Sequence, residues 1–309
     1  MTTDWLLVIG GFALLLGGGE VVVQGAVVLA RKMKVPPLLI GFTIVAIGTS
    51  LPELAVSLEA VAGGKPDLAV GGVLGSNVAN VMLVLGTASF LGAASDPGEG
   101  VRRDAVAMML ATLILLAMVI YGEITWYFGI MMLTILIGYY AYSYVNSRED
   151  AERELDDSWV PDSVLISMAV TMIGGALIWK GAEFLVDGAT GIASDLGISE
   201  AVIGLSVVAL GTSLPELAVT LVAGLRGQGG VAVGNVLGSN MMNILGILGA
   251  TAAISGGILV SPNFAERDIW VVLITSGLVA GMLLDDREIG KTTGVSMVVG
   301  YLIYMSIIL

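Results

Sequence analysis

The sequence predicts an all-α integral membrane protein with ten transmembrane helices, arranged as two inverted-topology five-helix repeats. Three observations predict this fold. Hydrophobic residues make up 56% of the 309-residue chain and charged residues only 13%, whereas a soluble protein carries about 25% charge. Apolar runs long enough to cross a bilayer follow one another along the chain. The segment from Val45 to Leu58 returns at Val208 to Leu221, with twelve of the fourteen positions identical.

The apolar runs define the expected helices, since a spanning helix needs roughly 20 mostly apolar residues. These helices cover about 5–30, 36–61, 68–92, 104–121, 125–145, 161–190, 199–225, 230–257, 267–284 and 291–308. They form one membrane domain: a first five-helix repeat (1–148), an acidic cytoplasmic linker (149–160) and a second five-helix repeat (161–309). An offset of 163 residues aligns Thr49 with Thr212 and Glu53 with Glu216. Because five is odd, the second repeat enters the membrane from the opposite side.

The basic residues of the loops predict the orientation through the positive-inside rule. If the N-terminus faces outward, the cytoplasmic segments hold Arg31, Lys32, Lys34, Arg102, Arg103, Arg148, Arg153, Arg226, Arg287 and Lys291. The outer loops then hold only Lys65 and Arg267. We therefore expect a multi-pass protein of the plasma membrane with both termini outside and the central loop in the cytoplasm.

Several classes of function are disfavoured by composition. The chain has no cysteine and no histidine, which excludes disulfides, thiolate metal sites and imidazole metal sites. Its net charge of −13 argues against a nucleic-acid partner. No nucleophile–base pair and no cofactor motif occurs, so we expect neither an enzyme nor a bound cofactor. The lipid bilayer is the expected partner, and no obligate protein partner is evident.

The repeated motif places oxygen ligands inside an apolar helix. Pro52 cannot donate a hydrogen bond to the carbonyl of Gly48, so carbonyl oxygens near Ala46 and Gly48 are expected to be free for a ligand. Helical spacing puts Ala46, Thr49, Ser50 and Glu53 on one face. The second copy of this set is Ala209, Thr212, Ser213 and Glu216. Two buried glutamates at matched places in two repeats predict a cation site between the halves.

The following helix of each repeat adds further oxygen atoms. Ser76 and Asn80 are four residues apart in Gly71–Asn80 and share a face, as do Ser239 and Asn243 in Gly234–Asn243. A site made only of carboxylate, hydroxyl, amide and carbonyl oxygens suits calcium or sodium. Magnesium is disfavoured because it gives up its water reluctantly.

The two Gly-Thr-Ser-Leu-Pro-Glu motifs, with their Gly-Ser-Asn-x-x-Asn partners, resemble the alpha-repeats of the cation/calcium antiporter superfamily. Nearly the whole chain resembles the short prokaryotic form of the sodium/calcium exchanger family. The resemblance implies calcium ligation by Thr49, Glu53, Thr212 and Glu216. It implies one sodium cage of the Ala46 carbonyl, Ser50, Glu53 and Ser76, and a second of the Ala209 carbonyl, Ser213, Glu216 and Ser239. Asn80 and Asn243 would border the centre.

The resemblance also implies a mechanism. Sodium and calcium would compete for the same glutamates and cross by alternating access, with about three sodium ions per calcium ion and net charge movement. Archaeal and potassium-dependent members have an aspartate where this chain has Asn243, so potassium co-transport is not expected. Two alternatives remain open. A proton/calcium exchanger would use the same glutamates, and a channel or membrane scaffold would need no counter-ion.

Overall fold

Helices account for almost all of this chain, as its apolar composition predicts. The computed structural model describes residues 2–92, 94, 98, 100–147, 158–197, 211–285 and 289–308. In the first half the elements are α1 (Thr2–Met33), α2 (Pro37–Ile40), the π-helical η1 (Gly41–Val45), α3 (Ala46–Thr49), α4 (Leu51–Ala62), α5 (Pro66–Ala79), the π-helical η2 (Asn80–Leu85), α6 (Gly86–Phe90), α7 (Val101–Tyr121), β1 (Glu123–Thr125) and α8 (Trp126–Asn146).

The second half shows a related series of elements. They are α9 (Val164–Asp195), α12 (Leu214–Leu225), α13 (Gly229–Met241), the π-helical η4 (Met242–Leu248), α14 (Gly249–Ser255), β2 (Gly257–Leu259), α15 (Asn263–Glu266), α16 (Asp268–Leu284) and α17 (Lys291–Ile308). Both ends of α12 follow those of α4 by 163 residues, and the start of α13 follows that of α5 by the same interval. The repeat in the sequence is therefore also a repeat of structural elements.

Among the residues that the structure describes, six helices are long and apolar enough to cross a membrane, and a seventh span results if one bent pair is counted together. The six are Thr2–Met33, Pro66–Phe90, Val101–Tyr121, Trp126–Asn146, Val164–Asp195 and Gly229–Ser255. The prediction of an all-α membrane protein is confirmed, while the number of ten spans stays a prediction. Of the expected helix 199–225, residues 199–210 lie outside the described residues, as do residues 149–157 of the expected linker.

The expected helix 36–61 is not continuous. Pro37–Thr49 and Leu51–Ala62 meet at an angle of 43°, and the break falls at Ser50, whose φ of −91° and ψ of 5° are not helical. Ser213, ahead of α12, has nearly the same backbone angles, −89° and −1°. In both copies the motif proline follows as the second residue of the new helix, where its missing N–H costs no hydrogen bond.

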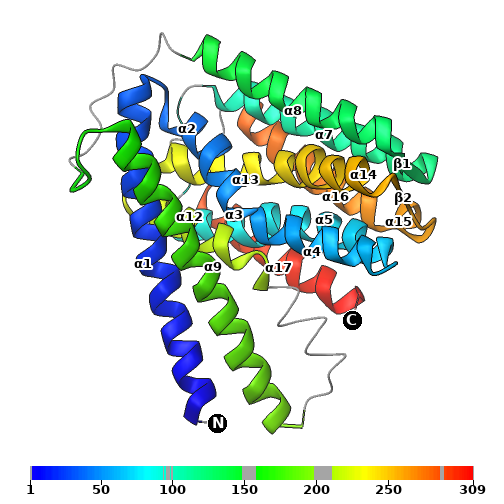
Figure 1. Ribbon diagram of the computed structural model, residues 1–309, viewed down its shortest axis with the longest axis horizontal. Helices are drawn as coiled ribbons and strands as arrows, with labels where there is room; N and C mark the ends of the chain where they lie inside the picture. Colours follow the sequence, from blue (N-terminus) through cyan, green and yellow to red (C-terminus); the bar gives the residue numbers. More distant parts are fainter. Residues whose placement is uncertain are drawn as a thin grey trace.

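The two longest helices, α1 and α9, lie side by side and antiparallel (Figure 1). Glycines at intervals of seven residues line the contact on both helices. A Cβ atom added at Gly18 would lie 2.9 Å from the Gly174 carbonyl oxygen, and one at Gly11 would lie 2.7 Å from the Gly181 carbonyl oxygen. Only glycine permits such close backbones, which is a packing mode typical of membrane helices.

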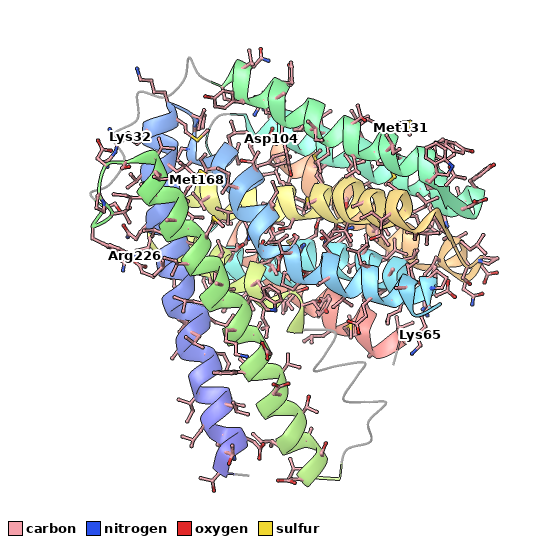
Figure 2. The ribbon with its side chains drawn as sticks, in the orientation of Figure 1. Lys32, Lys65, Asp104, Met131, Met168 and Arg226 are labelled. Carbon is pink, nitrogen blue, oxygen red and sulfur yellow. The ribbon has the colours of Figure 1, made fainter. Side chains whose placement is uncertain are left out.

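The remaining helices form a bundle around α13, whose residues from Val231 to Met241 are all buried. Strand β1 pairs antiparallel with β2, with Glu123 opposite Leu259, and so links the α7–α8 connection of the first half to the segment after α14 of the second. Lys32 and Arg226 lie toward one end of this bundle and Lys65 toward the other (Figure 2). The α13 helix, at the centre, carries the predicted site residue Ser239, and η4, which follows it directly, carries Asn243.

Candidate cation-binding site

One glutamate from each half lies in the interior of the protein, in the first turn of the helix that follows the motif serine. Glu53 is the third residue of α4 and Glu216 the third of α12. A helix N-terminus carries partial positive charge, so a carboxylate in its first turn is stabilised there. The two residues are 7% and 1% exposed, and Ser50, three residues before Glu53, reaches the Glu216 carboxylate at 3.2 Å. The structure thus brings together the two acidic residues that the sequence predicted to converge.

Residues from both halves meet at the Glu216 carboxylate. The Ser50 hydroxyl, from the break in the first half, donates to Glu216 Oε1 at 3.2 Å. The Ser239 hydroxyl, from α13, approaches the same oxygen at 3.5 Å. Sequence reasoning grouped Ser50 with Glu53 of its own half. In the structure the Ser50 hydroxyl crosses instead to the glutamate of the other half.

Thr49, immediately before the break, is the second point of contact between the halves. Its Oγ1 lies 3.2 Å from the Ala46 carbonyl oxygen, 3.3 Å from Asn235 Oδ1 and 3.5 Å from Ser239 Oγ. The Ala46 carbonyl oxygen also accepts the backbone N–H of Ser50 at 3.0 Å. The expectation of a free Ala46 carbonyl is therefore wrong for this structure. Pro52 removes only the hydrogen bond to Gly48, four residues earlier, and leaves the N–H of Ser50 available to Ala46.

Several buried oxygen atoms near the two motifs have no hydrogen-bond partner among the described residues. They are Glu53 Oε2, Glu216 Oε2, Asn80 Oδ1, Asn243 Oδ1 and Ser213 Oγ. A buried polar atom without a partner costs free energy. Oxygen acceptors gathered without donors are what a dehydrated cation can satisfy. Three of these residues were predicted as ion ligands, and Asn80 and Asn243 were expected to border the centre. Buried side-chain atoms without such a partner also occur at residues that were not predicted, such as Asn77 and Asn240.

The other predicted site residues are placed as follows. Ser76 lies on α5 and is 7% exposed, and Ser239 on α13 is fully buried. Thr212 is partly buried just ahead of α12, while Ala209 lies outside the described residues. Across the described part of the chain, no three Asp, Glu, His or Cys side chains gather as a resident metal would require. Two carboxylates together with neutral oxygen atoms instead suit a hard cation that binds and is released again, as a transported ion is.

Sequence reasoning missed Asn235, which is fully buried on α13. Besides its contact with Thr49, its Nδ2 donates to the Glu216 carbonyl oxygen at 3.3 Å and to Thr220 Oγ1 at 3.1 Å. The signal was present in the repeat, since the equivalent position of the first half is Gly72. A difference between otherwise matched copies indicates where the two halves have separate tasks.

A second buried acid was also missed. Asp104, near the start of α7, is fully buried; its Oδ1 accepts the Tyr139 hydroxyl at 2.6 Å and Arg103 Nε at 2.9 Å (Figure 2). Arg103 Nη1 donates in turn to Ser147 Oγ at 3.0 Å. With its own arginine in contact, this carboxylate joins α7 to α8 and offers no cation site.

Comparison with known proteins agrees with this geometry. Residues 3–145 and 166–309 match the family model described as sodium/calcium exchanger protein. The chain belongs to the sodium/calcium exchanger family. Matches on both sides of the central linker cover nearly the whole chain, and the resemblance noted from the motifs is confirmed.

Similar proteins within and beyond this family cover the full chain. The putative antiporter CaxA of Alkalimonas amylolytica is 32% identical over 100% of this chain and 97% of its own length. The sodium/calcium exchanger MaX1 of Methanosarcina acetivorans is 28% identical over 100% of this chain and 99% of its own. A solved structure of the sodium-calcium exchanger NCX_Mj, soaked with Na⁺ in the absence of Ca²⁺, superposes with a TM-score of 0.85 at 31% identity, covering 99% of this chain and 98% of that one. These similarities place the chain in the same all-α membrane fold.

Proposed function

We propose that this protein is a secondary antiporter that exchanges sodium for calcium across the membrane by alternating access. The observation that carries the proposal is the meeting of the halves at two buried carboxylates. Glu53 and Glu216 are both buried, and Glu216 is contacted by Ser50, which lies three residues before Glu53 in the opposite half. Like charges buried together are stabilised by a cation between them. Names of full-length relatives as sodium/calcium exchangers support the identity of the ions.

The proposed ligands follow the motif residues. Calcium is held by Thr49, Glu53, Thr212 and Glu216, and sodium occupies flanking positions that share these glutamates. The sodium cages are the Ala46 carbonyl, Ser50, Glu53 and Ser76, and the Ala209 carbonyl, Ser213, Glu216 and Ser239. Because the same two carboxylates bind both ions, the site holds either calcium or sodium at one time. Binding of one ion therefore requires release of the other, and this competition produces exchange.

Charge balance supports electrogenic transport. Two carboxylates neutralise one calcium ion, whereas about three sodium ions would leave one net positive charge to move through a field worth about 2.3 kcal/mol per 100 mV. Asn243 is neutral where a further acid would recruit another cation, and its buried Oδ1 has no partner among the described residues. We therefore propose transport that is independent of potassium.

The proposed orientation has both termini outside and the central loop in the cytoplasm. Lys32 and Arg226, assigned to the cytoplasm by loop charge, lie toward one end of the bundle, and Lys65, assigned outside, lies toward the other (Figure 2). That separation is what the positive-inside rule requires of a single membrane orientation.

The test is calcium uptake into proteoliposomes at equal internal and external pH. An outward sodium gradient should drive uptake, and replacing potassium with choline should leave the rate unchanged. An imposed positive-outside potential should slow uptake, because sodium leaving the vesicle carries the net charge. Uptake that needs a pH gradient and ignores sodium would identify a proton/calcium exchanger. Uptake that needs no counter-ion would identify a channel.

A further inference from the structure

One hydroxyl hydrogen has two acceptors at the break in the first half. Thr49 Oγ1 lies at nearly equal distances from the Ala46 carbonyl oxygen, 3.2 Å, and from Asn235 Oδ1, 3.3 Å. A hydroxyl donates a single hydrogen, so it can satisfy only one of these two oxygens well at a time. Ser239 Oγ is a weaker third neighbour at 3.5 Å, and it also lies 3.5 Å from Glu216 Oε1.

Which oxygen accepts the Thr49 hydroxyl hydrogen decides whether the Ala46 carbonyl oxygen can bind a cation. That oxygen already accepts the Ser50 N–H at 3.0 Å, so a second bond from Thr49 uses its remaining lone pair. If Thr49 donates to Asn235 instead, the lone pair of Ala46 is released for a cation. A cation at Ala46 also repels the Thr49 hydrogen, which favours the same rotation.

Asn235 is held in the orientation that this rotation needs. Its Nδ2 donates to the Glu216 carbonyl oxygen at 3.3 Å and to Thr220 Oγ1 at 3.1 Å. Both partners lie on α12, so the amide nitrogen faces α12 and the amide oxygen faces Thr49. Gly72, at the equivalent position of the first half, has no side chain to offer.

We propose that Asn235 is a positioning residue that takes the Thr49 hydroxyl hydrogen when a cation binds the Ala46 carbonyl. It contacts no ion in this scheme, and it acts by exchanging one hydrogen bond for another as the site fills. The inference rests on the proposed function, which places a sodium ion at the Ala46 carbonyl.

The test measures how sodium stabilises the purified protein against heat, since a ligand that binds the folded state raises the melting temperature. Asn235→Ala should raise the half-saturating sodium concentration by about three- to tenfold, the value of one neutral hydrogen bond. In a Thr49→Val background, which has no hydroxyl hydrogen, Asn235→Ala should change that concentration no further. This loss of additivity identifies action through Thr49. If Asn235→Ala does not fold, Asn235→Ser is tested in the same cycle.

Asn240→Ala is the matched control. Asn240 is another buried asparagine of α13, whose Nδ2 lies 3.4 Å from the Asn77 carbonyl oxygen, and its loss should leave half-saturating sodium unchanged. Equal effects of Asn235→Ala in the two Thr49 backgrounds, or no stabilisation of the wild type by sodium, would overturn the inference. Sodium that stabilises the protein as described but drives no calcium uptake would overturn the proposed function alone.

Discussion

The centre of the molecule and the α1–α9 pair differ in the residues that they bury and in what stabilises them. At the centre, two glutamates with hydroxyls and amides are buried, and several of their oxygen atoms have no partner among the described residues. Between α1 and α9, glycines bring two backbones into contact, and the charged side chains are exposed at the ends and edges. The centre sacrifices stability to keep acceptors available, whereas the pair is stabilised by the fit of its backbones.

The largest expected effect is the loss of calcium uptake when either central glutamate is replaced. Glu53→Gln and Glu216→Gln each remove half of the formal charge of the site. The bound calcium ion would then lose one of the two carboxylates that neutralise its charge, so calcium uptake should fall by about 100-fold or more. The melting temperature without added ions should not fall, since glutamine is close to glutamate in size and carries no charge for burial to penalise.

Glu183→Gln provides the matched control on the helix pair. Glu183 accepts Lys180 Nζ at 2.8 Å, and both side chains are about half exposed. Glu183 lies on α9, outside the proposed set of ion ligands, so uptake should remain within about twofold of the wild type. Near-normal uptake in either central variant would remove the basis for placing the ion between the two motifs.

The next effect concerns the close contact of the helix pair. A Cβ atom at Gly18 would lie 2.8 Å from Ile178 Cγ1 and 2.9 Å from the Gly174 carbonyl oxygen, whereas one at Gly17 would meet no described atom within 4 Å. Gly18→Ala should therefore lower stability by about 2 kcal/mol through overpacking. Gly17→Ala should raise it by up to about 1 kcal/mol through helix propensity. Thermal unfolding in detergent measures both, and equal effects would show that α1 and α9 do not pack as described.

Much of the fold and part of the site could be predicted from the sequence. The two prolines predicted interruptions, and Ser50 and Ser213 mark them with nearly the same backbone angles. Helical spacing predicted that Thr49, Ser50 and Glu53 share a face, because this depends only on the chain nearby. Membrane-grade composition predicted the all-α class for the same reason.

Contacts between the halves could not be predicted in this way. Spacing within one helix does not say which hydroxyl reaches which carboxylate, so the hydrogen bond from Ser50 to Glu216 could not be foreseen from the grouping of Ser50 with Glu53 in one sodium cage. The hydrogen bonds to the Ala46 carbonyl depend on where α3 ends, which the proline alone does not fix. Asn235 was missed because its role depends on a partner 186 residues away.

A smaller effect compares the two motif serines. Ser50 Oγ donates to Glu216 Oε1 at 3.2 Å, while Ser213 Oγ is buried and has no partner among the described residues. Ser50→Ala should lower the free energy of unfolding by about 1–2 kcal/mol without added ions, because the carboxylate loses a donor. Ser213→Ala should change it by less than about 0.5 kcal/mol, since no bond is lost. Both variants should weaken sodium-dependent uptake if both serines are ligands. If Ser213→Ala lowered the free energy of unfolding as much as Ser50→Ala does, Ser213 would have to make a hydrogen bond equivalent to that of Ser50.

The smallest effect lies at the rim of the helix pair, where Asp162 contacts Lys32 and lies 3.3 Å from Arg31 Nη2. The hydrogen bond from Lys32 lowers the pKa of the Asp162 carboxyl below its ordinary value, and the nearby positive charge of Arg31 adds to this. A carboxyl whose pKa is depressed by folding stabilises the folded state fully above its unfolded pKa of about 3.9. This contribution is lost as the pH falls through the lower, folded value.

Asp162→Asn should therefore reduce the melting temperature slightly at pH 7, and the difference from wild type should vanish when both are measured well below pH 3.9. Because both side chains are exposed, added salt should diminish the difference at pH 7 as well. A difference that persists in acid and in high salt would mean that Asp162 is held by packing, and the contrast between a rim of exposed charges and a buried polar centre would no longer hold.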